Sequence, residues 1–282
     1  MPVPKNGGKL AFDVARLLDQ DSIPNVLWGW LGLSLVASDQ GNREVEFVIP
    51  DNQIDDARKS LATAGFTVCT NPKCPELCED RFPEDQWRPT FRLMGIERQN
   101  ATVGAITSFD RYHPVAAAHY HVERQSAEYR ILSLHRKSSQ LWWLPELKTG
   151  PPSSDDRNLT LSNSSRLPTG KGRSGPWTDQ YPIKVLLPWA FLEAVMLLRC
   201  RDYGHTRGLH LLWNPILYLF CPHDEELRDK IHPRFRLAWD SLNDRRPEGE
   251  MQWLKMRHLR TSLIQAGELP DIPQPNNADR FV

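Results

Sequence analysis

Two glutamates, Glu44 and Glu46, alternate with apolar residues in the segment 43–49. That alternation predicts a β-strand, on which residues two positions apart face the same side, roughly 7 Å from one another. Val45, Phe47 and Ile49 face the opposite side, where we expect the core. Paired carboxylates at this spacing can hold a divalent cation together with a substrate phosphate, or they can place hydrogen bonds and protons on a bound molecule. We therefore interpret both glutamates as candidate catalytic residues.

A second set of polar side chains, His119, His121 and Glu123, alternates with Tyr120 and Val122. On a strand, all three polar side chains face one way. They can form a metal-binding His-x-His pair, a general acid–base pair, or a hydrogen-bonding wall opposite the two glutamates. The alternative is that both imidazoles simply make hydrogen bonds at the surface of the sheet. We interpret His119 and His121 as catalytic and Glu123 as substrate-binding.

Two tryptophans flank a glycine in Trp28, Gly29 and Trp30, at the end of a short apolar run. Aromatic walls around a few polar groups are typical of small-molecule sites, and they are also typical of tryptophan-rich cores. The chain has ten tryptophans, so both interpretations stay open. We expect these three residues to line the mouth of a pocket and to bind substrate.

Three cysteines, Cys69, Cys74 and Cys78, lie within ten residues. Their spacing differs from the C-x-x-C of zinc knuckles, and no fourth ligand of matching spacing follows them. We interpret the segment as a proline-punctuated loop, with Cys69 at the end of a strand, and a zinc site as the alternative. Five cysteines, an odd number without a secretion signal, indicate reduced thiols.

The order of these elements resembles the nucleotidyltransferase superfamily, which includes polymerase-beta-like and antibiotic-adenylating enzymes. Its motif is an apolar residue, Gly, then Gly or Ser, about a dozen residues, and an acid-apolar-acid strand. Here residues 31–43 separate Trp30 from Glu44. The strand end Phe-Val-Ile-Pro-Asp, the Ala-Gly-Phe helix exit and the His-x-His strand further resemble a group of uncharacterised fungal proteins. The resemblance implies an α+β (mixed α/β) fold: a nucleotidyltransferase-like mixed sheet with flanking helices, followed by a C-terminal helical region.

The site departs from that family at three positions. Trp30 stands where a small residue lets the backbone approach nucleotide phosphates, and Glu44 stands where active members mostly have Asp. A third acid is expected on a neighbouring strand, and Glu123 is the nearest candidate. Mg²⁺ requires near-ideal octahedral geometry, so these changes matter. We therefore favour neither a metal nor another cofactor. In the alternative interpretation Glu44 and Glu46 bind Mg²⁺ with a nucleoside triphosphate.

The apolar periodicity predicts the elements that position these residues. We expect helices at 10–18, 30–37 and 51–64, the last capped by Asp51, and strands at 25–28, 43–49, 66–69, 102–106, 115–122 and 129–135. These belong to an α/β domain, 1–149. A polar stretch, 150–177, predicts a flexible loop or linker. A helical region, 178–267, with helices from Pro188 and at 225–242 and 248–267, is expected to pack on the sheet domain, and 268–282 forms a loose tail.

Composition limits the possible partners. The 282 residues contain 35 Lys and Arg against 35 Asp and Glu, which gives no support for a nucleic-acid partner. No run approaches 18 apolar residues, so we expect no membrane partner. The first residues lack the apolar core of a signal peptide, which predicts a cytoplasmic protein. The oligomeric state is left open.

Three functions from different classes fit these observations. The first is an enzyme on a nucleotidyltransferase-like scaffold, repurposed for metal-free cyclisation, isomerisation or a pericyclic step on a small apolar metabolite in fungal specialised metabolism. The second is a Mg²⁺-dependent nucleotidyltransferase acting on a small hydroxylated acceptor. The third is a binding protein without catalytic activity, since a fold does not fix a function.

Overall fold

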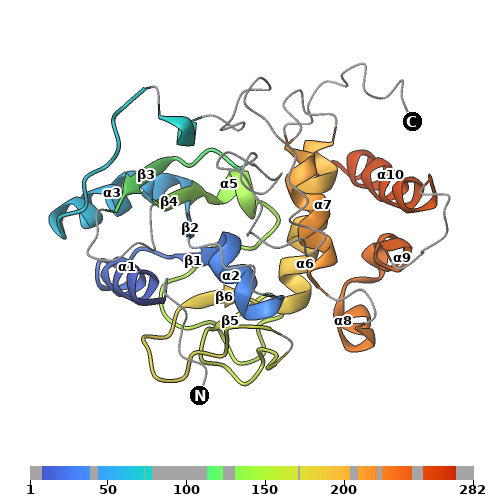
Figure 1. Ribbon diagram of the computed structural model, residues 1–282, viewed down its shortest axis with the longest axis horizontal. Coiled ribbons are helices and arrows are strands. Elements are labelled where there is room, and N and C mark those ends of the chain that lie inside the picture. The colour runs from blue at the N-terminus through green and yellow to red at the C-terminus, as the bar shows by residue number, and fades with distance from the viewer. Residues whose placement is uncertain are drawn as a thin grey trace, which may run out of the picture.

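The computed structural model shows a mixed α+β protein built around a six-stranded mixed sheet (Figure 1). The structure describes residues 8–38, 44–72, 74–77, 113–122, 131–170, 172–203, 209–220, 224–242 and 250–270. The mixed α+β class expected from the sequence is confirmed. Within this part of the chain, no helix has the length and apolar character needed to cross a membrane.

The strands lie in the order β3-β4-β2-β1-β6-β5 across the sheet. Their bounds are Val26–Trp28 (β1), Val45–Ile49 (β2), Ala118–His121 (β3), Ile131–Arg136 (β4), Leu159–Leu161 (β5) and Lys184–Leu186 (β6). The pairs β2–β4 and β1–β6 are parallel, whereas β1–β2, β3–β4 and β5–β6 are antiparallel. The acid-bearing strand β2 is thus central, and every residue of it is buried.

The register brings four side chains into one row across four strands. Trp28 pairs with Glu46, Glu46 with Ser133, and Ser133 with His119. Directly paired residues of neighbouring strands project from the same face of a sheet. Glu46 therefore has an aromatic neighbour on one side and a hydroxyl on the other.

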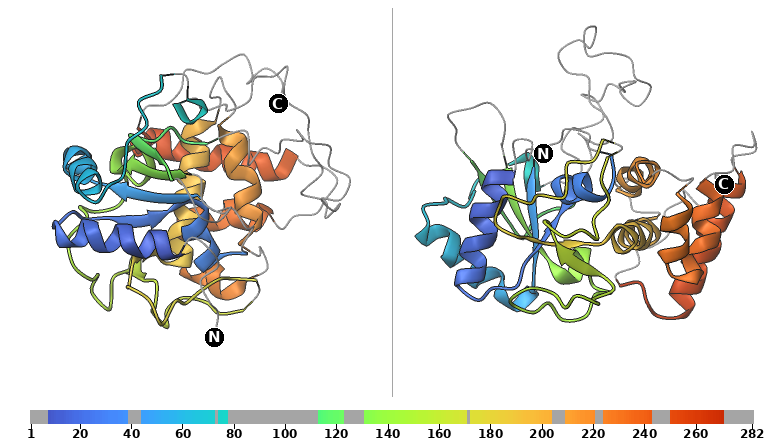
Figure 2. Two further views of the ribbon diagram at one scale, coloured as in Figure 1. Left: turned by 60° about the vertical axis from the view of Figure 1, so that its left-hand side comes forward. Right: turned by 90° about the horizontal axis from the view of Figure 1, so that it is seen from below.

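Helices cover both faces of this sheet (Figure 2, right). Helices α1 (Gly8–Gln20) and α3 (Ile54–Thr63) lie on one side, and α2 (Gly29–Val36) and α6 (Pro188–Asp202) lie on the other. Both α1 and α3 bury one apolar stripe, as their sequence periodicity predicts. Helix α6 is buried on nearly all sides, because it packs on the sheet side and against further helices.

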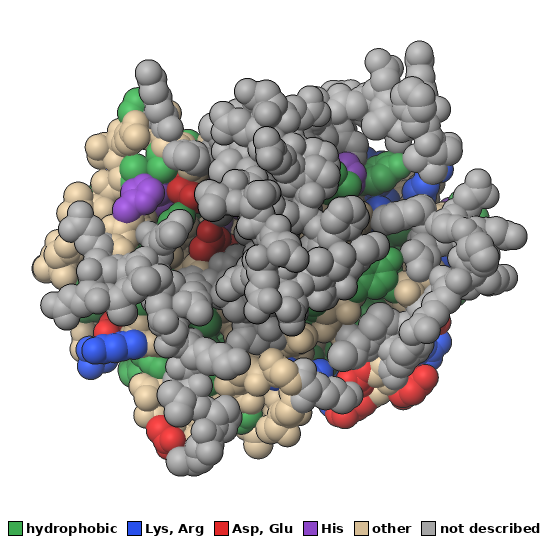
Figure 3. Space-filling model, in the orientation of Figure 1, with side chains coloured by type: hydrophobic (Ala, Val, Ile, Leu, Met, Phe, Trp, Pro, Cys, Tyr) green, Lys and Arg blue, Asp and Glu red, His purple; other side chains and the backbone are tan. Residues whose placement is uncertain are grey.

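The C-terminal helices extend the molecule away from the sheet (Figure 1). They are α7 (His210–Tyr218), α8 (Glu225–Lys230), α9 (Pro233–Leu242) and α10 (Glu250–Gln265). We expected one helix over 225–242, but the structure breaks it between Lys230 and Pro233. Proline disfavours a helical conformation in the residue before it, which explains the break. On the face shown in Figure 3, acidic, basic and hydrophobic side chains of described residues are interspersed.

Three local expectations differ from the structure. Residues 66–70 form no strand and make one backbone bond to the sheet edge, from Cys69 N to His119 O. Asp51 does not cap α3, because a 3₁₀ turn, Asp51–Gln53, precedes that helix. The carboxylate of Asp51 instead accepts from Ser138 N at 3.0 Å. The expected strand 102–106 lies outside the described residues, as do Cys78 and Glu123.

The polar segment 150–177, expected as a flexible loop or linker, contributes the edge strand β5 to the sheet. Side chains bind its backbone and so replace the apolar contacts that its composition lacks. Asp156 Oδ1 accepts from Leu159 N at 2.9 Å, and Arg166 Nη2 donates to Asp156 O at 2.6 Å. Trp177, which is 1% exposed, anchors the end of the segment in the core.

Candidate functional site

A pocket that opens to solvent at its mouth lies between the sheet and helices α6 and α7. Its polar side chains are contributed by the strands and the segments next to them, and its apolar side chains come mainly from the helices. The polar lining residues are Glu44, Glu46, His113, Ser133 and His135. Trp28, Trp30, Phe191, Leu212, Trp213 and Ile216 contribute most of the aromatic and aliphatic wall. A mostly apolar pocket with a few converging polar groups is the usual form of a small-molecule site.

Gly29 allows the carboxylate of Glu46 to lie against the backbone between β1 and α2. Gly29 has φ +61°, a left-handed conformation that favours glycine. A Cβ atom at this position would lie 2.0 Å from Glu46 Oε1 and 2.3 Å from Glu46 Cδ. Any larger residue would therefore displace the carboxylate. The glycine of the sequence motif is required here by a close approach to the acid.

Glu46 pairs with a histidine that the sequence did not single out. His135 Nε2 lies 3.1 Å from Glu46 Oε2, so the imidazole donates its Nε2 proton to the carboxylate. Both side chains are buried, at 2% exposure for His135 and 7% for Glu46. His135 Nδ1 has no hydrogen-bond partner among the described residues. In the neutral imidazole that donates from Nε2, Nδ1 is a hydrogen-bond acceptor.

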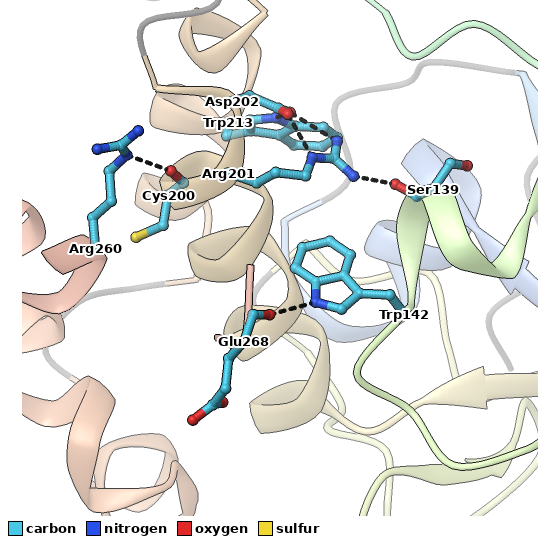
Figure 4. A network of polar contacts seen from close by, with 8 residues as sticks. All are labelled: Ser139, Trp142, Cys200, Arg201, Asp202, Trp213, Arg260 and Glu268. Atoms are coloured by element: carbon cyan, nitrogen blue, oxygen red, sulfur yellow. Dashed lines mark hydrogen bonds and ion pairs between the residues drawn. The ribbon is translucent and has the colours of Figure 1, made fainter. Parts of the chain in front are cut away.

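The aromatic wall is held by contacts between the sheet and the helices. Trp28 stacks on Phe191 of α6, with ring centroids 4.6 Å apart and planes at 17°. Trp213 of α7 donates from Nε1 to Asp202 Oδ2 at 2.7 Å (Figure 4). Asp202 also accepts from Arg201 Nε at 2.6 Å, and Arg201 reaches the backbone oxygen of Ser139 beside the sheet. This network fixes the orientation of the Trp213 ring at the pocket.

A second imidazole–carboxylate pair borders the pocket. His113, which lines it, has Nδ1 3.6 Å from Glu76 Oε2, and both side chains are largely buried. The pocket thus contains two histidines, His113 and His135, where the sequence analysis expected His119 and His121. Alternation in Ser133-Leu134-His135 already placed a serine and a histidine on one face of a predicted strand. The sequence pattern does not show that this strand, β4, pairs with the acid-bearing strand β2.

The structure divides the predicted site residues into two groups. Trp28, Gly29, Trp30, Glu44 and Glu46 line the pocket together. His119 and His121 do not line it.

His119 shares the row of Glu46 but lies two strands away, roughly 10 Å at the usual strand spacing. The side chains of His119 and His121 instead converge on Cys74, with each Nε2 within 3.4 Å of the sulfur. Burial raises the pKa of the Cys74 thiol. Cys69, Cys74, His119 and His121 thus form a cluster of their own, beside the pocket rather than in it.

The described pocket residues differ from the magnesium site that the nucleotidyltransferase resemblance implies. That site needs a third acid on a strand next to the acid strand, but β1 and β4, which flank β2, carry none. Ser133 stands directly opposite Glu46, and His135 occupies one oxygen of its carboxylate. Mg²⁺ takes oxygen ligands in strict octahedral geometry, and among the described pocket residues the carboxylates are those of Glu44 and Glu46, the second of which is bonded to His135.

Comparison of the chain with protein-family models and with curated proteins returns no match. The function of this pocket therefore has to be inferred from its own side chains.

Proposed function

We propose that this chain is an enzyme that rearranges a small, mostly apolar metabolite by cyclisation, isomerisation or a pericyclic step. The observation that carries the proposal is the buried Glu46–His135 pair in an aromatic pocket. Carboxylates and imidazoles are common general acids and bases, and an apolar pocket orients a ligand against them.

The two residues have different roles in this proposal. Glu46 Oε2 accepts from His135, which leaves Oε1, next to Gly29, to accept a proton from a bound substrate. In an isomerisation, Glu46 takes a proton from one carbon of the substrate and returns it to another, so that no co-reactant is consumed. His135 holds the carboxylate in place and stabilises its charge. The wall of Trp28 and Phe191 excludes water and positions an apolar substrate.

We further propose that the scaffold is nucleotidyltransferase-like and no longer transfers nucleotides. The tight turn at Gly29 beneath an acid on the adjacent strand supports the first part. Ser133 in place of a third acid, and the bulky Trp30 beside Gly29, support the second.

Nucleotide transfer stays the second candidate, because Glu44 and Glu46 both line the pocket. Calorimetric titration of the full chain with each nucleoside triphosphate and Mg²⁺ or Mn²⁺ separates the two functions. We expect no binding at concentrations up to about 1 mM. Micromolar affinity that is lost in Glu46→Gln would replace our proposal with nucleotide transfer.

Proton exchange in D₂O tests the proposal before the natural substrate is known. The full chain is incubated with a panel of apolar ketones and enones, and deuterium uptake at carbon is followed by NMR. We expect protein-dependent uptake that falls about 100-fold or more in Glu46→Gln. Glu193→Gln is the matched control, because Glu193 is also a buried carboxylate and does not line the pocket. Panel compounds that bind but exchange equally in wild type and Glu46→Gln would favour a binding protein.

A further inference from the structure

Four side chains from two separate parts of the chain converge beside the edge strand β3. They are Cys69 and Cys74, from the segment after α3, and His119 and His121, from β3. One ligand atom from each residue can be chosen so that all four lie within 4.8 Å of one another. Cys74 Sγ lies 3.3 Å from His119 Nε2 and 3.4 Å from His121 Nε2. None of the four lines the pocket.

These separations match the edges of a tetrahedral metal site. With Zn–S bonds of about 2.3 Å and Zn–N bonds of about 2.0 Å, the edges are about 3.3 to 3.8 Å long. The two sulfur–nitrogen separations, 3.3 and 3.4 Å, lie in this range. The other pairs of ligand atoms are at most 4.8 Å apart, so they would have to approach by at most about 1.5 Å. Two thiols and two imidazoles are also the donors that zinc prefers, whereas Mg²⁺ and Ca²⁺ take oxygen ligands.

We propose that Cys69, Cys74, His119 and His121 form a structural Cys₂His₂ zinc site. Four protein ligands complete a tetrahedron, so no position is left open for water or substrate, as is typical of structural rather than catalytic zinc. The proposal does not depend on the function of the pocket. For the cysteine-rich segment we thus favour the zinc site over a simple loop. Two of its ligands, His119 and His121, could not be found from the spacing of the cysteines.

The backbone holds the four donors in place without a metal. His119 and His121 face one side because they are two positions apart on β3. Cys69 N donates to His119 O at 2.9 Å, which fixes this segment along the edge of β3. Cys74 sits in a turn, where its N–H donates to Asn71 O at 3.1 Å and its carbonyl accepts from Leu77 N at 3.0 Å.

Hydrogen bonding alone is a poor explanation for this cluster. A thiol has one proton, so Cys74 can donate to only one of the two imidazoles that approach its sulfur. Sulfur is also a weak acceptor for the other. A disulfide between Cys69 and Cys74 would use both sulfurs and leave the convergence of the imidazoles unexplained. A cation that all four donors can bind accounts for the whole arrangement.

The zinc would tie the segment after α3 to the edge of the sheet. Glu76, two residues beyond Cys74, pairs with His113, which lines the pocket. A metal at this position therefore stabilises one border of the pocket without touching a ligand in it.

Metal analysis of the full chain, purified without chelators from zinc-supplemented cells, tests the proposal. We expect about one zinc per chain. A mercurial reagent that titrates thiols should release the zinc in step with modification of two cysteines. Cobalt added to the chelator-treated chain should give the visible bands of tetrahedral cobalt and a thiolate-to-cobalt charge-transfer band. These measurements need no variant and so do not depend on whether a variant folds.

Variants then assign the ligands. Cys74→Ser and His121→Gln should each lower zinc content by more than half and remove or shift the cobalt bands. Cys200→Ser is the matched control, because Cys200 is a buried thiol distant from the cluster in sequence and contacts Met256 instead. Its zinc content should equal that of the wild type. Little zinc in the wild type, an alkylation-resistant Cys69–Cys74 disulfide, or zinc that survives in Cys74→Ser would each overturn the proposal.

Discussion

Replacing Gly29 by alanine tests the central geometry of the pocket. The residue has φ +61°, and a left-handed conformation costs an alanine roughly 1–2 kcal/mol relative to glycine. The added Cβ would also lie 2.0 Å from Glu46 Oε1. The carboxylate can rotate away, so this overlap does not set the energy. The cost is the loss of the hydrogen bond to His135, about 1.5–3 kcal/mol for a bond to a charged group. We therefore expect Gly29→Ala to lower the free energy of unfolding by about 2.5–5 kcal/mol.

Gly267→Ala is the matched control for backbone strain. Gly267 has φ +67°, nearly the same conformation, but no atom lies within 4 Å of the position of its Cβ. We expect a cost of only about 1–2 kcal/mol there. The larger loss of unfolding free energy in Gly29→Ala is caused by the contact with Glu46. In a Glu46→Ala background, the loss caused by Gly29→Ala should therefore fall to that caused by Gly267→Ala.

Urea unfolding followed by tryptophan fluorescence measures all these proteins on one scale. Equal costs for Gly29→Ala and Gly267→Ala would refute the contact between Gly29 and the carboxylate. An unchanged cost of Gly29→Ala in the Glu46→Ala background would refute it independently.

Three further predictions use the same unfolding assay. Phe47 is fully buried in β2, so Phe47→Ala should lower the free energy of unfolding by about 3–5 kcal/mol. An unchanged urea midpoint would mean that the strand register is wrong. Glu46→Gln should leave the unfolding free energy within about 1 kcal/mol of wild type, because the amide oxygen can still accept from His135; a larger loss would show that the charge stabilises the fold. Burial, and next a hydrogen bond to Asp19, raise the pKa of Tyr181 from 10.0 to about 12. The neutral hydroxyl therefore stabilises the fold below pH 10, and this stabilisation is lost as the pH rises from 10 to about 12. The free energy of unfolding of Tyr181→Phe should change less with pH in that window than that of the wild type. Equal slopes of unfolding free energy against pH in the two proteins would contradict the raised pKa.

Local sequence patterns predicted the elements that carry the acids. Alternation in β2 placed Glu44 and Glu46 on one face, and both line the pocket. Gly29 marked the turn between β1 and α2, where its left-handed backbone is required. These features depend on neighbours in the chain, so a single sequence contains the information for them.

The partners of the acids depend on strand order, which local patterns do not specify. His119 and His121 were expected opposite the glutamates, but β4 lies between β3 and β2 and places Ser133 and His135 there instead. Similarly, Cys69 and Cys74 had no fourth ligand by spacing, because their neighbours His119 and His121 come 45 or more residues later. Long-range pairing therefore determines which side chains meet in both places. In 150–177, side-chain bonds to the backbone stabilise a segment whose polar composition predicts a flexible loop or linker.

The polar pair and the apolar wall of the pocket come from different parts of the chain. Glu46 and His135 come from the central strands, whereas Leu212 and Ile216 come from α7, far along the sequence. Substitutions at Leu212 or Ile216 change the space offered to a ligand without altering Glu46 and His135, the pair that we propose acts on it. Under the proposed function, stepwise substitutions in α7 would therefore change which ligand fits the pocket while Glu46 and His135 stay in place.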